Sequence, residues 1–256
     1  MKTLGVIFLL NLFLMSCSTS IKSGSYTESY IDDLSGDTIK IRIDTNVMSK
    51  DTFFLKRKTT NGVRTNSIFI DQNKNSLFYN TVFGVSVYDN QNIRYYLNEL
   101  SKRKAVLSHL NLSDFPTEWR PVVKYRNKYY LYQPSDAGGK GTIMVTDSTL
   151  MPYLFGDGYT PIALDSVTKK TDNLYIIKTK HLVSIDQSCP SEVNIFVLDK
   201  KTMLAVWEMK NENGTEYRLM VPKATMQYFP IIVNSSTNKE DEFDFETIDY
   251  KKLINR

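Results

Sequence analysis

Residues 193–221 read VNIFVLDKKTMLAVWEMKNENGTEYRLMV and contain the clearest secondary-structure signal in the chain. Apolar and polar residues alternate along three runs, as they do in half-buried strands. These runs are Val193–Leu198, Met203–Met209 and Thr215–Val221. The intervening residues 199–202 and 211–214 are rich in Asp, Asn, Lys and Gly, which are typical of tight turns. The stretch therefore predicts a three-stranded antiparallel meander.

The same pattern recurs on the N-terminal side of this meander. Asn61-Gly62 separates two strand-like runs and is a strong hairpin signal, because a type I′ turn needs positive φ at both central residues. Arg126-Asn127-Lys128 predicts a second hairpin. Further strands are expected at Leu77–Tyr79 and Val82–Tyr88. We count about fifteen short strands at spacings of roughly 8 to 15 residues, which predicts an all-β fold.

The expected architecture is a mostly antiparallel sandwich or barrel. Alternating strand and helix units are absent from the pattern, which argues against a parallel sheet. A small β-propeller is the alternative, because Leu198–Leu204 resembles the strand–turn–strand of a propeller blade. The other hairpins do not repeat at the fixed period of about 40 residues that a propeller requires.

One helix is expected near residues 91–104. Ile93, Tyr96, Leu97 and Leu100 are spaced three and four residues apart, so they share one face of a helix. Two asparagines, at positions 90 and 92, are candidate caps for its first turn. We expect this helix to lie against one end of the β structure.

Composition excludes several classes of partner. The chain has 256 residues, 41% of them hydrophobic, which supports a packed core and argues against disorder. Its 32 basic and 28 acidic residues leave a formal charge of only +4, so we expect no nucleic-acid partner.

The N-terminus has the layout of a secretory signal. Lys2 is followed by the apolar run Leu4–Met15, which is too short to span a membrane. The ending Leu14-Met15-Ser16-Cys17 resembles the lipobox of bacterial lipoproteins. The resemblance implies cleavage before Cys17 and acylation of its thiol, with three acyl chains that hold the mature chain at the membrane. No acidic run follows Cys17, so we expect an outer-membrane protein that faces the periplasm.

These signals divide the chain into four expected parts. They are a signal peptide at 1–16, a lipidated N-terminus and flexible tether at 17–35, a β domain at 36–234, and an acidic C-terminal tail at 235–256. The tail includes two phenylalanines, and we expect it to lie at the surface and outside the core.

Residues suited to catalysis or metal binding are scarce. His109 and His181 are the only histidines, and neither has a second His or Cys within four residues, as a zinc site would favour. His181 with Ser184 or Ser188 is the remaining nucleophilic arrangement, but the chain has no G-x-S-x-G motif. We expect no catalytic residues, no metal and no cofactor.

Three other features are assigned structural roles. With Cys17 acylated, Cys189 is left without a disulfide partner, and we expect it to be buried. Residues 71–75 copy the first ligands of a calcium loop but lack its glycine and its bidentate glutamate. The glycine-rich residues 136–141 and 156–158 do not match a phosphate-binding loop, and we interpret them as loops that could frame a ligand mouth.

Tyrosines are concentrated at 95–96, 125 and 129–132. Within a strand, Tyr130 faces away from Tyr129 and Leu131, so we expect only one of these two sets to be buried. Outward-facing rings would be suited to a sugar or a protein partner.

The function expected from these features is binding in the cell envelope, without catalysis. Three classes stay open. A ligand-binding barrel would have an internal apolar cavity, and a protein-interaction module (including an immunity or assembly lipoprotein) would have an exposed aromatic patch. A carbohydrate-active enzyme would have two carboxylates about 5–10 Å apart in a cleft.

Overall fold

The structure is a computed structural model of the chain. It describes residues 25–31, 38–44, 52–60, 63–72, 74, 78–79, 87–112, 115–135, 141–154, 158–180, 189–236 and 243–255.

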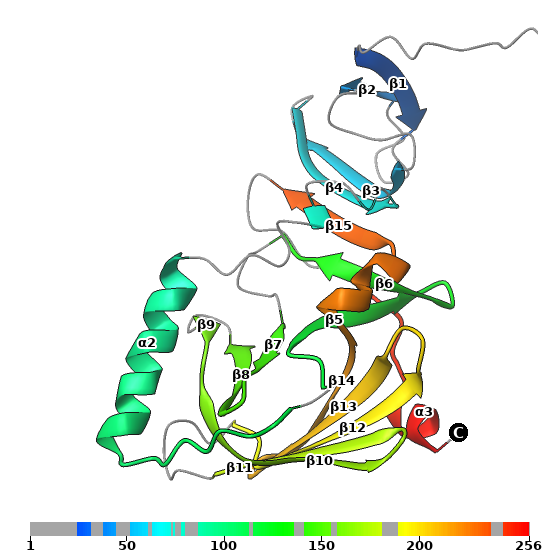
Figure 1. The fold of residues 1–256 in the computed structure, drawn as a ribbon. Helices are drawn as coiled ribbons and strands as arrows, with labels where there is room; N and C mark the ends of the chain where they lie inside the picture. Colours follow the sequence, from blue (N-terminus) through cyan, green and yellow to red (C-terminus); the bar gives the residue numbers. More distant parts are fainter. Residues whose placement is uncertain are drawn as a thin grey trace, which may run out of the picture.

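Eight strands form a closed antiparallel barrel, so the all-β prediction is confirmed (Figure 1). In chain order they are β5 (Glu118–Tyr125), β7 (Ile143–Val145), β8 (Thr149–Leu154), β10 (Ile162–Thr171), β11 (Leu174–Thr179), β12 (Glu192–Asp199), β13 (Leu204–Asn211) and β14 (Gly214–Pro222). Each strand pairs with the next, and β14 returns to β5. The two-residue strand β9 (Gly158–Tyr159) pairs with β8 at the side of the barrel. The predicted meander makes up β12, β13 and β14.

A second sheet branches from β5. The first residues of β5 pair with β7, whereas Val122–Tyr125 pair with β6 (Lys128–Gln133). The ladder then continues through β15 (Ile231–Ser236) and β4 (Val63–Asp71) to β3 (Thr52–Thr60). The β6–β15 pair is parallel, and the other pairs of this sheet are antiparallel.

The core has two main parts because barrel side chains alternate between inside and outside. Val193, Ile195 and Val197 on β12 belong to the cluster inside the barrel, together with Trp119 and Trp207. The outward-facing residues pack instead against the second sheet, and form a second cluster. Its buried members are Phe69, Tyr79, Val122, Leu131, Leu204, Val206, Leu219, Val221, Phe229, Ile231 and Val233.

Two expected hairpins are confirmed. β3 and β4 pair up to Thr60 and Val63, on either side of the predicted Asn-Gly turn. β5 and β6 are joined by Arg126 and Asn127, whose φ angles are 47° and 59°. Both angles lie in the left-handed region, as a two-residue type I′ turn requires.

The predicted helix is confirmed as α2 (Val87–Lys102), although it starts earlier than expected. Ile93, Tyr96 and Leu97 are half-buried and Leu100 is buried, so the predicted face is the one that packs. The asparagine caps were wrong, because positions 90 and 92 lie inside the helix. Two short helical segments follow later, the 3-10 helix η2 (Lys223–Tyr228) and α3 (Tyr250–Ile254).

Some expectations were wrong. The strand expected at Val82–Tyr88 is contradicted at its C-terminal end, where Val87 and Tyr88 belong to α2. Phe78 and Tyr79 are helical, although a strand was expected there. These residue types favour strands in isolation, but tertiary context overrides that preference. The propeller is excluded, because the described strands from β3 to β15 form one continuous 13-stranded sheet and not separate blades.

The N-terminal region contains one strand that was not expected, at residues 25–31, whereas the alternation of apolar and polar residues at 38–44 predicts its partner strand. β1 (Ser25–Ile31) pairs with β2 (Thr38–Asp44) in a separate two-stranded antiparallel sheet. Part of the range assigned to a flexible tether is therefore a strand. Its tyrosines, threonine and isoleucine were a β signal that the small polar residues before it obscured.

Candidate functional site

Several residues singled out in the sequence lie outside the described residues. These include Cys17, so its lipidation stays a prediction, and also His181, Ser184 and Ser188. Cys189 is described. It is half-buried and takes part in no disulfide, whereas the sequence predicted a buried thiol.

The inside of the barrel is filled by side chains. Trp119 and Trp207 are both fully buried, and their rings meet edge to face with centroids 5.1 Å apart. Phe115 lies against Trp119 at a centroid distance of 5.8 Å. The buried members of this cluster have exposed fractions of 0–6%. An eight-stranded barrel is just wide enough to be filled in this way, so its interior is a packed core.

The segment between α2 and β5 packs against the interior cluster and is held by polar contacts. Leu110 and Leu112 pack against the cluster. Lys180 Nζ donates hydrogen bonds to the Val106 carbonyl at 2.6 Å and to the Ser108 hydroxyl at 2.8 Å. These contacts join the segment to the end of β11.

His109 belongs to the same segment. Its Nδ1 lies 2.6 Å from Oδ2 of Asp147, in the turn between β7 and β8, and this contact lowers the pKa of Asp147. The His109 side chain is 80% exposed, so the pair is a surface contact of small energetic worth. The pair therefore connects this segment to the turn between β7 and β8.

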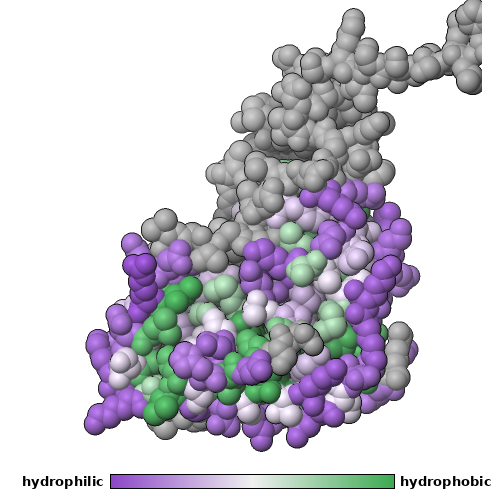
Figure 2. Space-filling view, in the orientation of Figure 1, coloured by the Kyte–Doolittle hydropathy of each residue, from purple (hydrophilic) through white to green (hydrophobic). Residues whose placement is uncertain are grey.

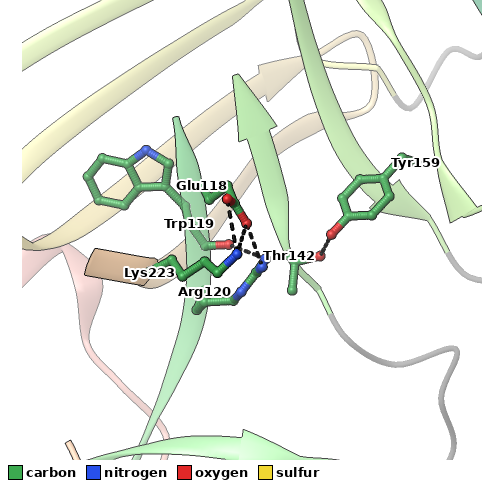
Figure 3. A network of polar contacts seen from close by, with 6 residues as sticks. All are labelled: Glu118, Trp119, Arg120, Thr142, Tyr159 and Lys223. Atoms are coloured by element: carbon green, nitrogen blue, oxygen red, sulfur yellow. Dashed lines mark hydrogen bonds and ion pairs between the residues drawn. The ribbon is translucent and has the colours of Figure 1, made fainter. Parts of the chain in front are cut away.

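A cluster of charged side chains around one buried arginine lies where the barrel closes (Figure 3). Arg120 is fully buried on β5, and its Nη2 donates to Oε2 of Glu118 at 3.1 Å. Lys223, at the start of η2, donates to both oxygens of the same carboxylate at 3.1 and 2.9 Å. Because Lys223 follows β14, this carboxylate joins the first and last strands of the barrel.

Neighbouring hydroxyls extend this cluster. Thr142 Oγ1 and the Tyr159 hydroxyl are 2.8 Å apart beside Arg120, and both residues are buried. Burial lowers the pKa of Arg120, and Tyr159 and Glu118 oppose this shift. The guanidinium has no exposed surface, so this cluster suits the closure of the barrel and not the binding of a ligand.

A pair of carboxylates lies on the outside of the barrel. Nδ2 of Asn194 donates to Glu208 at 2.8 Å and to Glu192 at 3.4 Å, so it bridges the two acids. Lys210 Nζ lies 2.8 Å from Glu192 and 3.7 Å from Glu208. The Tyr217 hydroxyl donates to the other oxygen of Glu208 at 2.9 Å. The hydrogen bond from Lys210 lowers the pKa of Glu192, which favours its charged form.

The aromatic face is the surface of the second sheet that points away from the barrel. Its buried residues are Ile68, Ile70, Tyr130 and Ile232, and its half-buried residues include Val123, Tyr125 and Tyr132. Leu131 faces the opposite way, into the core between the two sheets, and is also fully buried. The expectation that only one side of β6 is buried was therefore wrong, because both faces of this sheet are covered.

The cover over the aromatic face is formed by Phe243 and Phe245, at the start of the C-terminal strap (residues 243–255). Phe243 meets Tyr125 edge to face at a centroid distance of 5.3 Å, and Phe245 meets Tyr132 at 4.7 Å. The Tyr250 ring then stacks on Tyr217 of β14, with centroids 5.7 Å apart. The alternation of Phe with acidic residues at 243–246 was the signal that could have predicted this contact.

Apolar surface is also present near α2. The exposed large apolar residues include Tyr95 on α2 and Val106 just after it, with exposed fractions of 59% and 72%. Figure 2 shows apolar residues gathered beside α2 and across the lower part of the barrel, surrounded by hydrophilic ones.

Within the described part of the chain, no helix combines the length and the apolar character needed to cross a membrane. The same residues include no group of three or more His, Cys, Asp or Glu side chains placed to hold a metal ion. Comparisons with family models, curated proteins and solved structures found no match.

Proposed function

We propose that this chain is a lipoprotein of the bacterial cell envelope that is anchored through Cys17 and binds a protein partner with its β domain. The anchor rests on the lipobox-like ending of the leader. The outer membrane, with the β domain facing the periplasm, is the proposed location. The binding role rests on the structure of the barrel.

The packed barrel interior is the observation that carries this proposal. Trp119 and Trp207 fill the position where a carrier would hold its ligand, and neither side chain has exposed surface. Recognition is therefore assigned to the outside of the fold. Aromatic side chains gather there, and aromatic residues supply much of the binding energy at protein interfaces.

The carboxylate geometry does not favour a carbohydrate-active enzyme. Such an enzyme needs one acid with a raised pKa to protonate the leaving group. Glu192 instead has a lowered pKa, because Lys210 donates a hydrogen bond to it. Glu208 accepts hydrogen bonds from Asn194 and Tyr217, so both of its oxygens already have partners within the fold.

The anchor is tested by labelling cells with palmitate. We expect the wild-type chain to incorporate the label and to fractionate with membranes, and Cys17→Ala to lose both properties. Equal labelling of the two chains would contradict the anchor.

The binding mode is tested with an apolar fluorescent dye, using the purified chain. We expect no dye binding by the wild type, whereas Trp207→Ala, which opens space inside the barrel, should bind it. Saturable micromolar binding by the wild type would favour a small-molecule carrier.

Crosslinking in cells tests for the protein partner directly. A photoreactive residue at position 95 in one variant, and at position 125 in a second, should give a discrete protein adduct from at least one position.

A further inference from the structure

The aromatic face is built without help from the strap that covers it. Tyr130 pairs with Val123 across β5 and β6, and Ile232 pairs with Ile70 across β15 and β4. Backbone pairing within the sheet therefore holds these residues in place. A sheet face of this kind, with apolar residues and three tyrosines, is the type of surface that proteins use for recognition.

The strap is seated on this face as an extended peptide would be. Phe243 and Phe245 are half-buried against the sheet, whereas Asp244 and Glu246 are exposed. This alternation places the two phenylalanines on one side of an extended backbone. Each ring meets a different tyrosine of the sheet edge to face, at centroid distances of 5.3 and 4.7 Å.

The acidic residue after the phenylalanines meets a basic rim. Glu246 Oε2 lies 3.1 Å from Lys124 Nζ, and the Asn127 backbone N–H donates to Oε1 at 3.2 Å. The Arg126 guanidinium lies over the Tyr125 ring, 5.2 Å from its centroid. The charge of the rim is thus complementary to an acidic peptide.

Few backbone bonds hold the strap to the sheet. Among the described residues 243–246, the Glu246 N–H donates to the Lys124 carbonyl at 3.1 Å, and the Phe243 N–H donates to the Tyr132 hydroxyl at 3.4 Å. No residue from 243 to 255 is buried. Contacts made by partly exposed side chains on a preformed surface are readily exchanged.

We propose that the aromatic face is a docking site for an extended protein segment with two aromatic residues two positions apart, followed by an acidic residue. The chain's own residues 243–246 occupy this site as an exchangeable internal ligand, which the partner displaces. The inference rests on the proposed protein-binding function and names the surface and the partner chemistry. The apolar surface beside α2 carries no such proposal, because nothing in the structure indicates what covers it.

The test uses the full chain in detergent and a fluorescein-labelled peptide, KEDEFDFETI, which copies residues 239–248. The vacated chain carries Phe243→Ala and Phe245→Ala, and binding is followed by fluorescence anisotropy. A tethered segment competes at an effective concentration in the millimolar range. We therefore expect the vacated chain to bind the peptide at least tenfold more tightly than the intact chain, and a peptide with both Phe replaced by Ala not to bind.

A charge swap separates docking from a purely structural role. In the vacated chain, Lys124→Glu should weaken peptide binding about tenfold, as expected for a hydrogen-bonded charged pair. A peptide carrying Glu246→Lys should restore much of this loss. Loss without rescue would contradict the proposed rim contact.

Three outcomes would overturn the inference. One is equal affinity of the vacated and intact chains for the peptide, and another is no binding by a vacated chain with a wild-type circular dichroism spectrum. The third is a dimer of the intact chain that the double variant does not form, which would assign the face to a second copy.

Hydrogen exchange on the intact chain tests the inference without any variant. We expect amides of residues 243–246 to exchange at least 100-fold faster than those of β15. Equal protection would show that the strap is a fixed part of the fold. Peptide binding with no partner crosslinked in cells would count against the proposed function alone, whereas crosslinking without peptide binding would count against this site alone.

Discussion

Replacing each core tryptophan by phenylalanine should affect stability unequally. The two residues look alike in burial, since both are fully buried in the same cluster. They differ in hydrogen bonding. Trp119 Nε1 donates to the Pro116 carbonyl at 2.7 Å, whereas Trp207 Nε1 is buried and makes no hydrogen bond to the residues that the structure describes.

The magnitudes follow from this difference. Replacing a buried Trp by Ala costs about 3–5 kcal/mol, and we expect the smaller change to Phe to cost roughly 1–2 kcal/mol at either site. Trp119→Phe also loses a hydrogen bond, which adds about 1 kcal/mol. Trp207→Phe removes an unsatisfied buried donor, and the relief of about 1–3 kcal/mol offsets most of its packing loss. Trp119→Phe should therefore be the less stable variant by about 2 kcal/mol or more.

Equilibrium urea unfolding measures this difference directly. The chain has two tryptophans, so each variant keeps one and reports through its own fluorescence. Circular dichroism on the same samples checks that unfolding is two-state. For a chain of this size the melting temperatures should differ by roughly 4–8 °C. Equal destabilisation of the two variants would refute the reasoning, and would mean that the Trp207 N–H is satisfied within the core, for example by the ring face of Trp119.

Three further predictions concern sites outside this core. Glu118→Gln leaves the buried Arg120 without its carboxylate and should lower the free energy of unfolding in urea by about 2 kcal/mol. This loss is smaller than for a fully buried pair because the Glu118 side chain is 33% exposed. A loss below about 0.5 kcal/mol would contradict the role of this cluster in barrel closure. Gly158→Ala should destabilise the chain by about 1–3 kcal/mol and speed amide exchange in α2. The φ angle of Gly158 is +71°, and an added Cβ would lie 3.1 Å from the Asp89 carboxylate on that helix. Unchanged exchange in α2 would be inconsistent with this contact. The pKa of Glu246 is lowered mainly by the hydrogen bond with Lys124. The contribution of this pair to strap docking should therefore be fully present above the usual glutamate pKa of about 4.3 and be lost as the pH falls through the lower pKa of the folded chain. An NMR titration of the Glu246 amide should show its midpoint rise in Lys124→Met, and an unchanged midpoint would argue against the pair.

Local pattern was enough to predict several elements. The meander that became β12–β14 follows from alternation and from turn residues, and both are visible within a few positions. The helix face of Ile93, Tyr96, Leu97 and Leu100 follows from spacing in the same way. The start of α2 did not follow, because Val87 and Tyr88 have strand-like preferences that tertiary context overrides.

The candidate site was much less predictable. Tyrosines at 125, 130 and 132 were recognised as an aromatic concentration, but the side that each ring faces was left open. Leu131 and Tyr130 are both buried because one packs toward the barrel and the other lies under the strap. The barrel strands that cover Leu131 and the strap that covers Tyr130 are both distant from β6 in sequence. No local pattern around this strand could therefore predict that both of its faces are buried.

By itself, the sequence determined the all-β class, the antiparallel hairpins, the single amphipathic helix near position 95 and the absence of a recognisable catalytic motif. Each of these depends on the chemistry of residues that are neighbours along the chain. Only the tertiary structure decided that β14 closes onto β5, that β5 belongs to two sheets, and that the strap covers the aromatic face. The barrel closure and the strap contacts join residues about a hundred positions apart. All of these contacts form because both faces of a sheet must bury their apolar side chains, a requirement that periodicity within one strand does not express.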